Sequence, residues 1–353
     1  MQFRVSWLRS SIQNVLLGAA TLAIVACGQS ENEEDIPPDP PPIFDEELGQ
    51  RITVSGISSG GYMAVQAHVA LSDRVAGVAA VAGGPYHCAE GSVTVALGRC
   101  LSGDDLDIAG LVSHTRDAAA AGQIAGVEAL ADSRIWIFHS PKDSVVSLDV
   151  SAGLVDFYDP FVTGERIRFV DDVEAAHGWP TLEAGSDCLT LGGDFINACG
   201  FDTAGELLNH LYGTLHPAGH AVDGGALLSI ELADYFDSGS GIADDGYIYV
   251  PDSCRPSEDS CKLHIAFHGC RQGAEFIGDR FAVNAGLNEW ASANQIVVLY
   301  PQVESSLLNP QGCWDWWGYT GSNYDQRSGK QIAGINAIIT AFAKQALYPP
   351  EMS

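Results

Sequence analysis

A serine flanked by glycines stands between a β-strand pattern and a helical pattern near the start of the chain. The strand-like run Arg51–Ser55 leads into Gly56-Ile57-Ser58-Ser59-Gly60-Gly61, and a helical segment begins at Tyr62. A G-x-S-x-G turn in this setting holds its serine in a strained backbone conformation, which glycine neighbours permit because they lack Cβ atoms. The feature predicts an α/β architecture with Ser58 at the end of a strand. Ser59 does not fit the pattern, because Ile57 occupies the place of its upstream glycine.

Apolar runs of strand length alternate with helical patterns along the remaining chain. The predicted strands are Arg51–Ser55, Val75–Val81, Arg134–His139, Arg166–Val170, Gly246–Val250, Leu263–His268 and Gln295–Tyr300. The predicted helices are Gly61–Leu71, Gly122–Ala131, Phe281–Asn294 and Gln331–Leu347. This alternation predicts a single α/β domain, residues 44–353, around a mostly parallel central sheet.

A serine nucleophile needs a histidine to take its proton and an acid to orient that histidine. Asp143 follows the predicted strand Arg134–His139 and is the expected acid. A turn or helix N-cap is the alternative role for it, and Asp149 and Asp156 are poorer substitutes. His177 follows the next strand on a loop with small neighbours and is the expected base. The order Ser58, Asp143, His177 is the chain order of an α/β-hydrolase triad.

A strand ending in His-Gly stands late in the chain, at His268-Gly269-Cys270. In α/β hydrolases an oxyanion-loop sequence of this kind normally precedes the nucleophile. Its late position predicts a circularly permuted α/β-hydrolase, with an oxyanion hole made by the N–H groups of Ser59 and Cys270. A plain turn at the end of a strand is the alternative for His268-Gly269.

The N-terminus is typical of an exported protein. Two arginines precede an apolar stretch that is too short to span a bilayer and that ends at Cys27 in a lipobox-like sequence. We expect residues 1–27 to be a lipoprotein-type signal peptide and 28–43 an acidic, proline-rich spacer. An ordinary signal peptide with a coincidental cysteine is the alternative. The predicted location is extracellular or on the cell surface, with a lipid on Cys27 as the membrane anchor.

The cysteine count agrees with export. Of nine cysteines, eight remain after Cys27, an even number that suits disulfides in an oxidising compartment. Sequence proximity pairs Cys88 with Cys100, Cys188 with Cys199 and Cys254 with Cys261, which leaves Cys270 and Cys313 for each other. No C-x-x-C occurs. The sequence therefore predicts neither a metal site nor a cofactor.

Charge excludes one class of partner. Asp and Glu number 45 against 17 Lys and Arg, which gives a formal net charge of −28. Such a surface repels phosphate backbones, so we expect no nucleic-acid partner.

Three separated motifs resemble extracellular poly(3-hydroxybutyrate) depolymerases, in particular their single-domain, circularly permuted branch. They are Gly56-Ile57-Ser58-Ser59-Gly60-Gly61-Tyr62-Met63, His268-Gly269-Cys270-Arg271-Gln272 and the segment from Asn309 to Tyr319. The resemblance implies the same triad and second oxyanion donor. It also implies an aromatic residue beside a substrate crevice, for which Trp314, Trp316 and Trp317 are candidates, with Tyr319 in the same segment. The family usually has His-Gly before the acid, where this chain has His139-Ser140.

The sequence accordingly predicts a serine esterase acting on poly(3-hydroxybutyrate), related short-chain polyesters or their oligomers. Apolar walls suit uncharged ester substrates. A feruloyl or acetyl esterase of plant polysaccharides on the same fold is one alternative. A non-catalytic surface lipoprotein that binds polymer through its tryptophans is the other.

Overall fold

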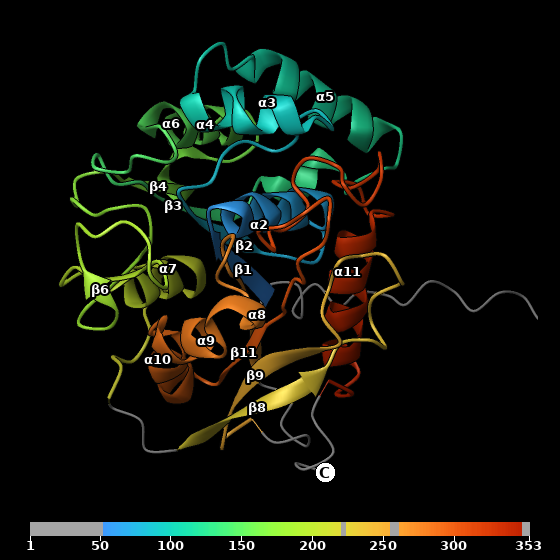
Figure 1. Ribbon diagram of the computed structural model, residues 1–353. Coiled ribbons are helices and arrows are strands. Elements are labelled where there is room, and N and C mark those ends of the chain that lie inside the picture. Colours follow the sequence, from blue (N-terminus) through green and yellow to red (C-terminus); the bar gives the residue numbers. More distant parts are fainter. Residues whose placement is uncertain (1–51, 220–223, 255–260, 348–353) are drawn as a thin grey trace, which may run out of the picture. The chain divides into compact units, whose positions relative to one another are not determined.

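Eight strands of the described residues form one central sheet, in the order β4-β3-β2-β1-β10-β11-β9-β8 (Figure 1). The computed structural model describes residues 52–219, 224–254 and 261–347, all within one compact unit, Phe44–Ser353. The sheet strands are β1 (Ile52–Ile57), β2 (Gly77–Val81), β3 (Arg134–Phe138), β4 (Ile167–Val170), β8 (Gly225–Glu231), β9 (Asp245–Pro251), β10 (Lys262–Phe267) and β11 (Ile296–Tyr300). From β4 to β11 all neighbours are parallel, whereas β9 pairs antiparallel with both β11 and β8.

Helices connect the strands in chain order. They are α2 (Ser59–Ala70), α3 (Val93–Leu97), α4 (Arg99–Ser102), α5 (Ile108–Ala120), α6 (Leu148–Tyr158), α7 (Thr203–Tyr212), α8 (Ala274–Ile277), α9 (Arg280–Asn284), α10 (Leu287–Asn294) and α11 (Lys330–Ala343). Two short 3₁₀ helices cover Val127–Leu130 and Gly164–Arg166.

Alternate residues of the parallel strands belong to two separate hydrophobic clusters. In β3, Ile135 and Ile137 join one cluster with residues of α2, α5, α6 and α11. Trp136 and Phe138 point to the other face, where residues of α7, α9 and α10 cover the sheet. Because successive side chains of a strand point to opposite faces, a strand buried on both sides is apolar throughout. That pattern is what made these strands recognisable in the sequence.

The predicted α/β fold with its mostly parallel sheet is confirmed, and each predicted strand has its counterpart. The predicted helix Gly122–Ala131 is wrong. Gly122 has φ +71° and follows the end of α5, and the rest of the range forms turns and one short 3₁₀ helix. The predicted helix Phe281–Asn294 is two helices, because Gly286 at φ +78° separates α9 from α10.

A small second sheet lies on the loops after β4. Its strands are β5 (Trp179–Thr181), β6 (Ser186–Asp187) and β7 (Ile196–Ala198), in the order β5-β7-β6. These strands of two or three residues are too short to show a periodicity in the sequence.

The predicted signal peptide, Cys27 and the spacer lie outside the described residues. No helix in the described ranges is long and apolar enough to cross a membrane.

Candidate active site

Ser58 stands at a sharp turn between β1 and α2. Its backbone has φ 55° and ψ −122°, its N–H donates to Val81 O at 2.9 Å, and its carbonyl accepts from Tyr62 N at 3.0 Å. A Cβ on Gly56 would lie 2.1 Å from the Gly60 carbonyl oxygen, and a Cβ on Gly60 would lie 2.2 Å from Phe267 O. Both positions therefore require glycine, as the sequence predicts. Ser58 is partly exposed between buried neighbours.

Asp143 and His177 meet across the loops that follow β3 and β4. His177 Nδ1 lies 2.7 Å from Asp143 Oδ2, with their side chains 7% and 2% exposed. The other carboxylate oxygen accepts from the N–H groups of Val145 at 2.7 Å and Val146 at 3.0 Å. Burial raises the Asp143 pKa, but the hydrogen bond and charge of His177 and these N–H groups outweigh it and hold the pKa below its usual range. The pair therefore suits an ionised acid that holds an imidazole by Nδ1, an arrangement in which Nε2 would serve as a base.

The loop that carries His177 is fixed by the small sheet. Trp179 N donates to Phe195 O at 2.8 Å, and the Phe195 ring meets the His177 ring edge-on at 6.3 Å. A Cβ on Gly178 would lie 1.8 Å from Asn197 Oδ1, so the glycine after His177 permits this close approach. The three candidate residues thus follow β1, β3 and β4 at the carboxyl edge of the sheet, where α/β proteins place their sites.

The loop after β10 lies against the Ser58 turn. A Cβ on Gly269 would be 3.5 Å from Ser58 Cβ and 3.3 Å from Ile57 O. Gly269 N donates to Gln272 Oε1 at 2.7 Å, and Gln272 Nε2 donates to Asp194 O and Phe195 O.

Two backbone N–H groups stand on the segments beside Ser58. Among the described residues, neither the Ser59 N–H nor the Cys270 N–H has a hydrogen-bond acceptor. Cys270 also forms a disulfide with Cys313, which ties its loop to the tryptophan-rich segment. The two N–H groups expected at an oxyanion hole are thus available on the two segments that meet beside Ser58.

The tryptophans of that segment differ in burial. Trp314 is fully buried and packs edge-on against Phe267 at 4.8 Å, so the expectation that it lines a crevice is not met. Trp316 is 5% exposed and stacks on Tyr62 at 4.2 Å. Trp317 is partly exposed and lies 5.1 Å from the Tyr319 ring, which is also partly exposed. Trp317 and Tyr319 are the members of this set that solvent reaches most.

All four predicted disulfides are present. They join Cys88 to Cys100, Cys188 to Cys199, Cys254 to Cys261 and Cys270 to Cys313. Two polar residues of the site were not foreseen. Gln272 received no role from the sequence, and Ser140 was noted only as a departure from the family pattern. The Ser140 hydroxyl accepts from Ala175 N, so it joins the acid loop to the histidine loop.

Similar proteins agree on one family. A poly(3-hydroxybutyrate) depolymerase from Delftia acidovorans is 40% identical over 291 residues, which is 81% of this chain and 58% of that protein. The chain thus spans less than two thirds of that relative's length. A polyhydroxybutyrate depolymerase from Talaromyces funiculosus is 33% identical over 347 residues, 94% of this chain and 95% of that protein. No family model matches the chain.

Solved structures give the same result. The crystal structure of a PHB depolymerase from Penicillium funiculosum has a TM-score of 0.78 at 33% identity, covering 84% of this chain and 96% of that one. A serine-to-alanine variant of a PHB depolymerase complexed with an R3HB trimer has the same scores. The chain therefore belongs to the poly(3-hydroxybutyrate) depolymerase family.

Proposed function

We propose that this protein is an exported serine esterase that hydrolyses poly(3-hydroxybutyrate), related short-chain polyesters and their oligomers. The observation that carries the proposal is the 2.7 Å contact between His177 Nδ1 and Asp143 Oδ2, on the sheet edge where the strained Ser58 turn also stands. Family membership supports the substrate class, since one relative's structure holds an R3HB trimer.

In the proposed mechanism His177 Nε2 takes the Ser58 hydroxyl proton as the serine oxygen attacks an ester carbonyl. Asp143 keeps the imidazole in the Nδ1–H form and stabilises the imidazolium that results. His177 then gives the proton to the departing alcohol, which leaves an ester between the acyl group and Ser58. Water attacks this acyl-enzyme by the same route, releases the acid and restores Ser58.

The Ser59 and Cys270 N–H groups are proposed to hold the negative oxygen of the tetrahedral intermediate. Support comes from their lack of acceptors among the described residues and from the position of the Gly269 turn, where an added Cβ would lie 3.5 Å from Ser58 Cβ. The N-terminus of α2 adds a favourable dipole at the same place.

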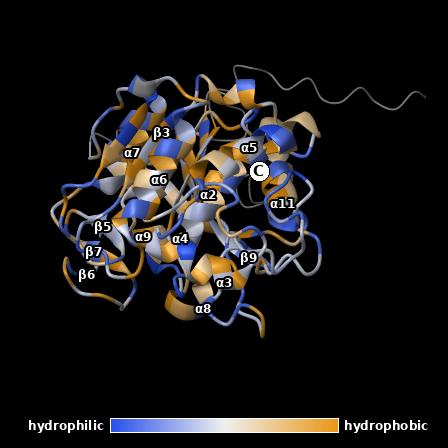
Figure 2. Cartoon of the chain, turned by 90° about the horizontal axis from the view of Figure 1, so that it is seen from above, coloured by the Kyte–Doolittle hydropathy of each residue, from blue (hydrophilic) through white to orange (hydrophobic). Residues whose placement is uncertain are grey.

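Trp317 and Tyr319 are proposed to bind the apolar backbone of the polyester. Aromatic faces suit an ester chain because it carries no charge. Adsorption to solid polymer would use apolar side chains on the surface of the catalytic domain itself. Exposed examples are Val93 and Leu97 on α3 and Phe276 on α8, two helices that carry hydrophobic residues in Figure 2, together with Leu307 and Leu308.

We also propose that the chain is circularly permuted. Strands β10 and β11, late in the sequence, pair beside β1 on the side opposite β2, and β10 leads into the loop with the second oxyanion donor. In the usual order the strand that leads to this loop precedes the nucleophile. Export and lipidation at Cys27 remain proposals from the sequence, and the four disulfides support export.

The test is clearing of a poly(3-hydroxybutyrate) suspension by the purified protein, beside a Ser58→Ala variant. We expect clearing by the first and none by the second. If neither protein clears the suspension but the unaltered chain hydrolyses methyl ferulate or acetylated polysaccharide in a Ser58-dependent way, the substrate is a plant ester and not the polyester. If Ser58 does not react with a fluorophosphonate probe, the protein binds polymer but does not catalyse its hydrolysis.

A further inference from the structure

Two histidines and a buried carboxylate converge at a place that the esterase mechanism does not use. His87 lies in the loop after β2, His114 in α5, and Asp325 in the segment before α11. One ligand atom from each lies within 4.8 Å of those of the other two. Among the described residues this is the one group of three or more His, Cys, Asp and Glu side chains with that geometry.

The side chains of the cluster contact one another directly. His87 Nδ1 lies 2.5 Å from Asp325 Oδ2, and the Asp325 side chain is 1% exposed. The His87 and His114 rings are stacked with centroids 3.6 Å apart and planes 8° from parallel. No hydrogen-bond partner of the His114 ring lies within the described part of the chain.

The backbone around the cluster is constrained as well. His87 has φ +60°, an uncommon conformation for a residue with a side chain, and it precedes the disulfide-bonded Cys88. Tyr86 donates through its hydroxyl to Asp325 O at 3.0 Å. Strained residues persist where the surrounding structure holds them and often mark ligand sites.

We propose that His87, His114 and Asp325 bind one Zn²⁺ ion. Two imidazoles and a carboxylate are common zinc ligands, and water supplies the fourth position of a tetrahedral site. The set does not suit Ca²⁺ or Mg²⁺, which prefer oxygen ligands. The His87 side chain is 20% exposed, so solvent reaches the cluster and the ion has a path of entry.

The three side chains must rearrange to form a closed zinc site. Zn–N bonds of about 2.0–2.1 Å at tetrahedral angles place ligand atoms about 3.3 Å apart. The His87 Nδ1–Asp325 Oδ2 pair, at 2.5 Å, must therefore open, and any pair as far apart as 4.8 Å must close by about 1.5 Å. Parallel rings cannot both point a nitrogen at one ion, so the two partly exposed imidazoles must also rotate out of their stack when zinc binds. Asp325 is the fixed member, because its surroundings bury it.

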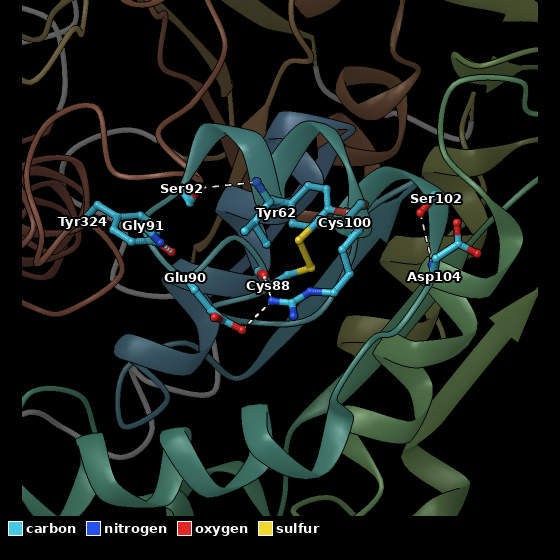
Figure 3. Close-up of a disulfide and its surroundings, with 11 residues drawn as sticks. Tyr62, Cys88, Glu90, Gly91, Ser92, Cys100, Ser102, Asp104 and Tyr324 are labelled. Carbon is cyan, nitrogen blue, oxygen red and sulfur yellow. Dashed lines mark hydrogen bonds and ion pairs between the residues drawn. A yellow bond between two sulfur atoms is a disulfide. The ribbon is translucent and has the colours of Figure 1, made fainter.

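Zinc at this position would join three segments of the fold. The disulfide between Cys88 and Cys100 closes the segment that follows His87, and Figure 3 shows Tyr324 lying against Gly91 of that segment. Gly91 N donates to the Tyr324 hydroxyl at 3.4 Å. The ion would thus fasten this segment to α5 and to the chain before α11.

The segment also connects, through Tyr62, to the tryptophan-rich segment. Tyr62 donates through its hydroxyl to Cys100 O and stacks on Trp316. The proposed zinc is therefore a structural ion that fixes the surroundings of the site, and it takes no part in the ester chemistry.

The test uses the full chain after removal of metal by a chelator. Zn²⁺ is titrated in competition with a chromophoric chelator, with elemental analysis for stoichiometry and thermal unfolding with and without Zn²⁺. We expect one Zn²⁺ per chain and a higher unfolding midpoint with zinc. Loss of a residue that only hydrogen-bonds a metal ligand weakens metal binding about 10- to 100-fold. His114→Gln removes a ligand itself, so it should weaken Zn²⁺ binding about 100-fold or more.

Two further variants complete the experiment. Asp325→Asn should also lose zinc, but its buried position makes His114→Gln the decisive variant, with circular dichroism to confirm its folding. His216→Gln alters an exposed histidine outside the cluster and should bind Zn²⁺ like the unaltered chain. Zinc affinity that is equal in His114→Gln and the unaltered chain, or a chain that retains no zinc against the chelator, overturns the proposal. These readouts measure metal alone and do not depend on the esterase proposal.

Discussion

The Ser140 hydroxyl accepts a hydrogen bond from Ala175 N at 2.7 Å, and it also accepts from Lys142 N at 3.0 Å. Asp143 stands three residues after Ser140, and His177 stands two residues after Ala175. A single buried oxygen therefore joins the loop of the proposed acid to the loop of the proposed base. A glycine at position 140 could not make this connection, so the departure from the His-Gly pattern has a structural role in this chain.

Ser140→Ala should lower kcat by about tenfold with little change in KM, since misplacement by about an ångström costs up to about 100-fold in rate. It leaves two N–H groups without an acceptor, so the free energy of unfolding should fall by about 1–3 kcal/mol. Steady-state kinetics and urea unfolding measure both. Ser147→Ala is the control, because it removes an N-cap of α6 at a similar cost of about 0.5–2 kcal/mol and should keep kcat. Equal kcat in Ser140→Ala and the unaltered chain would contradict the coupling.

Gln272→Leu should lower kcat by about tenfold, because its amide oxygen fixes Gly269 N beside the proposed oxyanion donor, and loss of a whole donor costs about 10²–10³. Gln302→Leu is a matched control. Gln302 is also buried, accepts from Ala274 N at 2.8 Å and donates to Tyr300 O. Both variants should lose stability, but kcat should fall in Gln272→Leu alone. A fall of the same size in both would show a general effect of packing.

The two tryptophans Trp314 and Trp317 should respond differently to alanine. Trp317→Ala should raise KM for hydroxybutyrate oligomers about 3- to 10-fold, the size of one aromatic contact, and leave hydrolysis of a small acetate ester unchanged. Trp314→Ala should lower the free energy of unfolding by about 3–5 kcal/mol, because Trp314 is fully buried. Oligomer kinetics and urea unfolding distinguish the outcomes. Unaltered oligomer KM in Trp317→Ala would remove Trp317 from the binding surface.

The disulfide between Cys270 and Cys313 should contribute more than the bridge between Cys254 and Cys261. The first spans 43 residues and the second 7. Loop-closure entropy predicts losses of about 4 and about 2 kcal/mol when each pair is replaced by serine. Only the first replacement should also reduce kcat, because it frees the loop of the second proposed oxyanion donor. Urea unfolding and ester kinetics of the two double variants test this, and a reversed order of stability would contradict it.

Fully buried histidines should make the fold sensitive to acid. Burial lowers the pKa of His68 and His264 to about 3 and that of His268 to about 4. An unfolded histidine titrates near pH ~6.5, so below that pH the unfolded chain binds more protons than the folded one. The stability is therefore complete above about pH 6.5 and is lost as the pH falls toward the folded values, at about 1.4 kcal/mol per pH unit for each histidine.

His264→Gln should reduce the slope of the unfolding free energy against pH by the contribution of one histidine, about 1.4 kcal/mol per pH unit between pH 4 and 6. His264 contacts Thr53 Oγ1 and Ser55 Oγ on β1, so the variant also begins from a lower stability. Urea unfolding from pH 4 to 7.5 measures the slope. The exposed His216→Gln variant should follow the unaltered chain. Parallel curves for His264→Gln and the unaltered chain would exclude His264 as a source of acid sensitivity.

The sequence by itself determined the features that follow from local sterics and short chain distances. Gly56 and Gly60 specify the Ser58 turn, because no side chain fits at either position. Strands such as β3 are recognisable because both their faces are buried. Three disulfides pair neighbours along the chain, and the fourth pair follows from elimination. The order of Ser58, Asp143 and His177 along the chain likewise predicted which residues gather at the sheet edge.

Only the tertiary structure decided the relationships between distant segments. His87, His114 and Asp325 show no ligand spacing along the chain, and they meet because a loop, a helix and the segment before α11 pack together. Ser140 and Ala175 meet across two loops, and Trp314 is buried while Trp317 remains partly exposed. Such contacts depend on how elements pack in three dimensions, and a residue's neighbours along the chain contain no record of that packing.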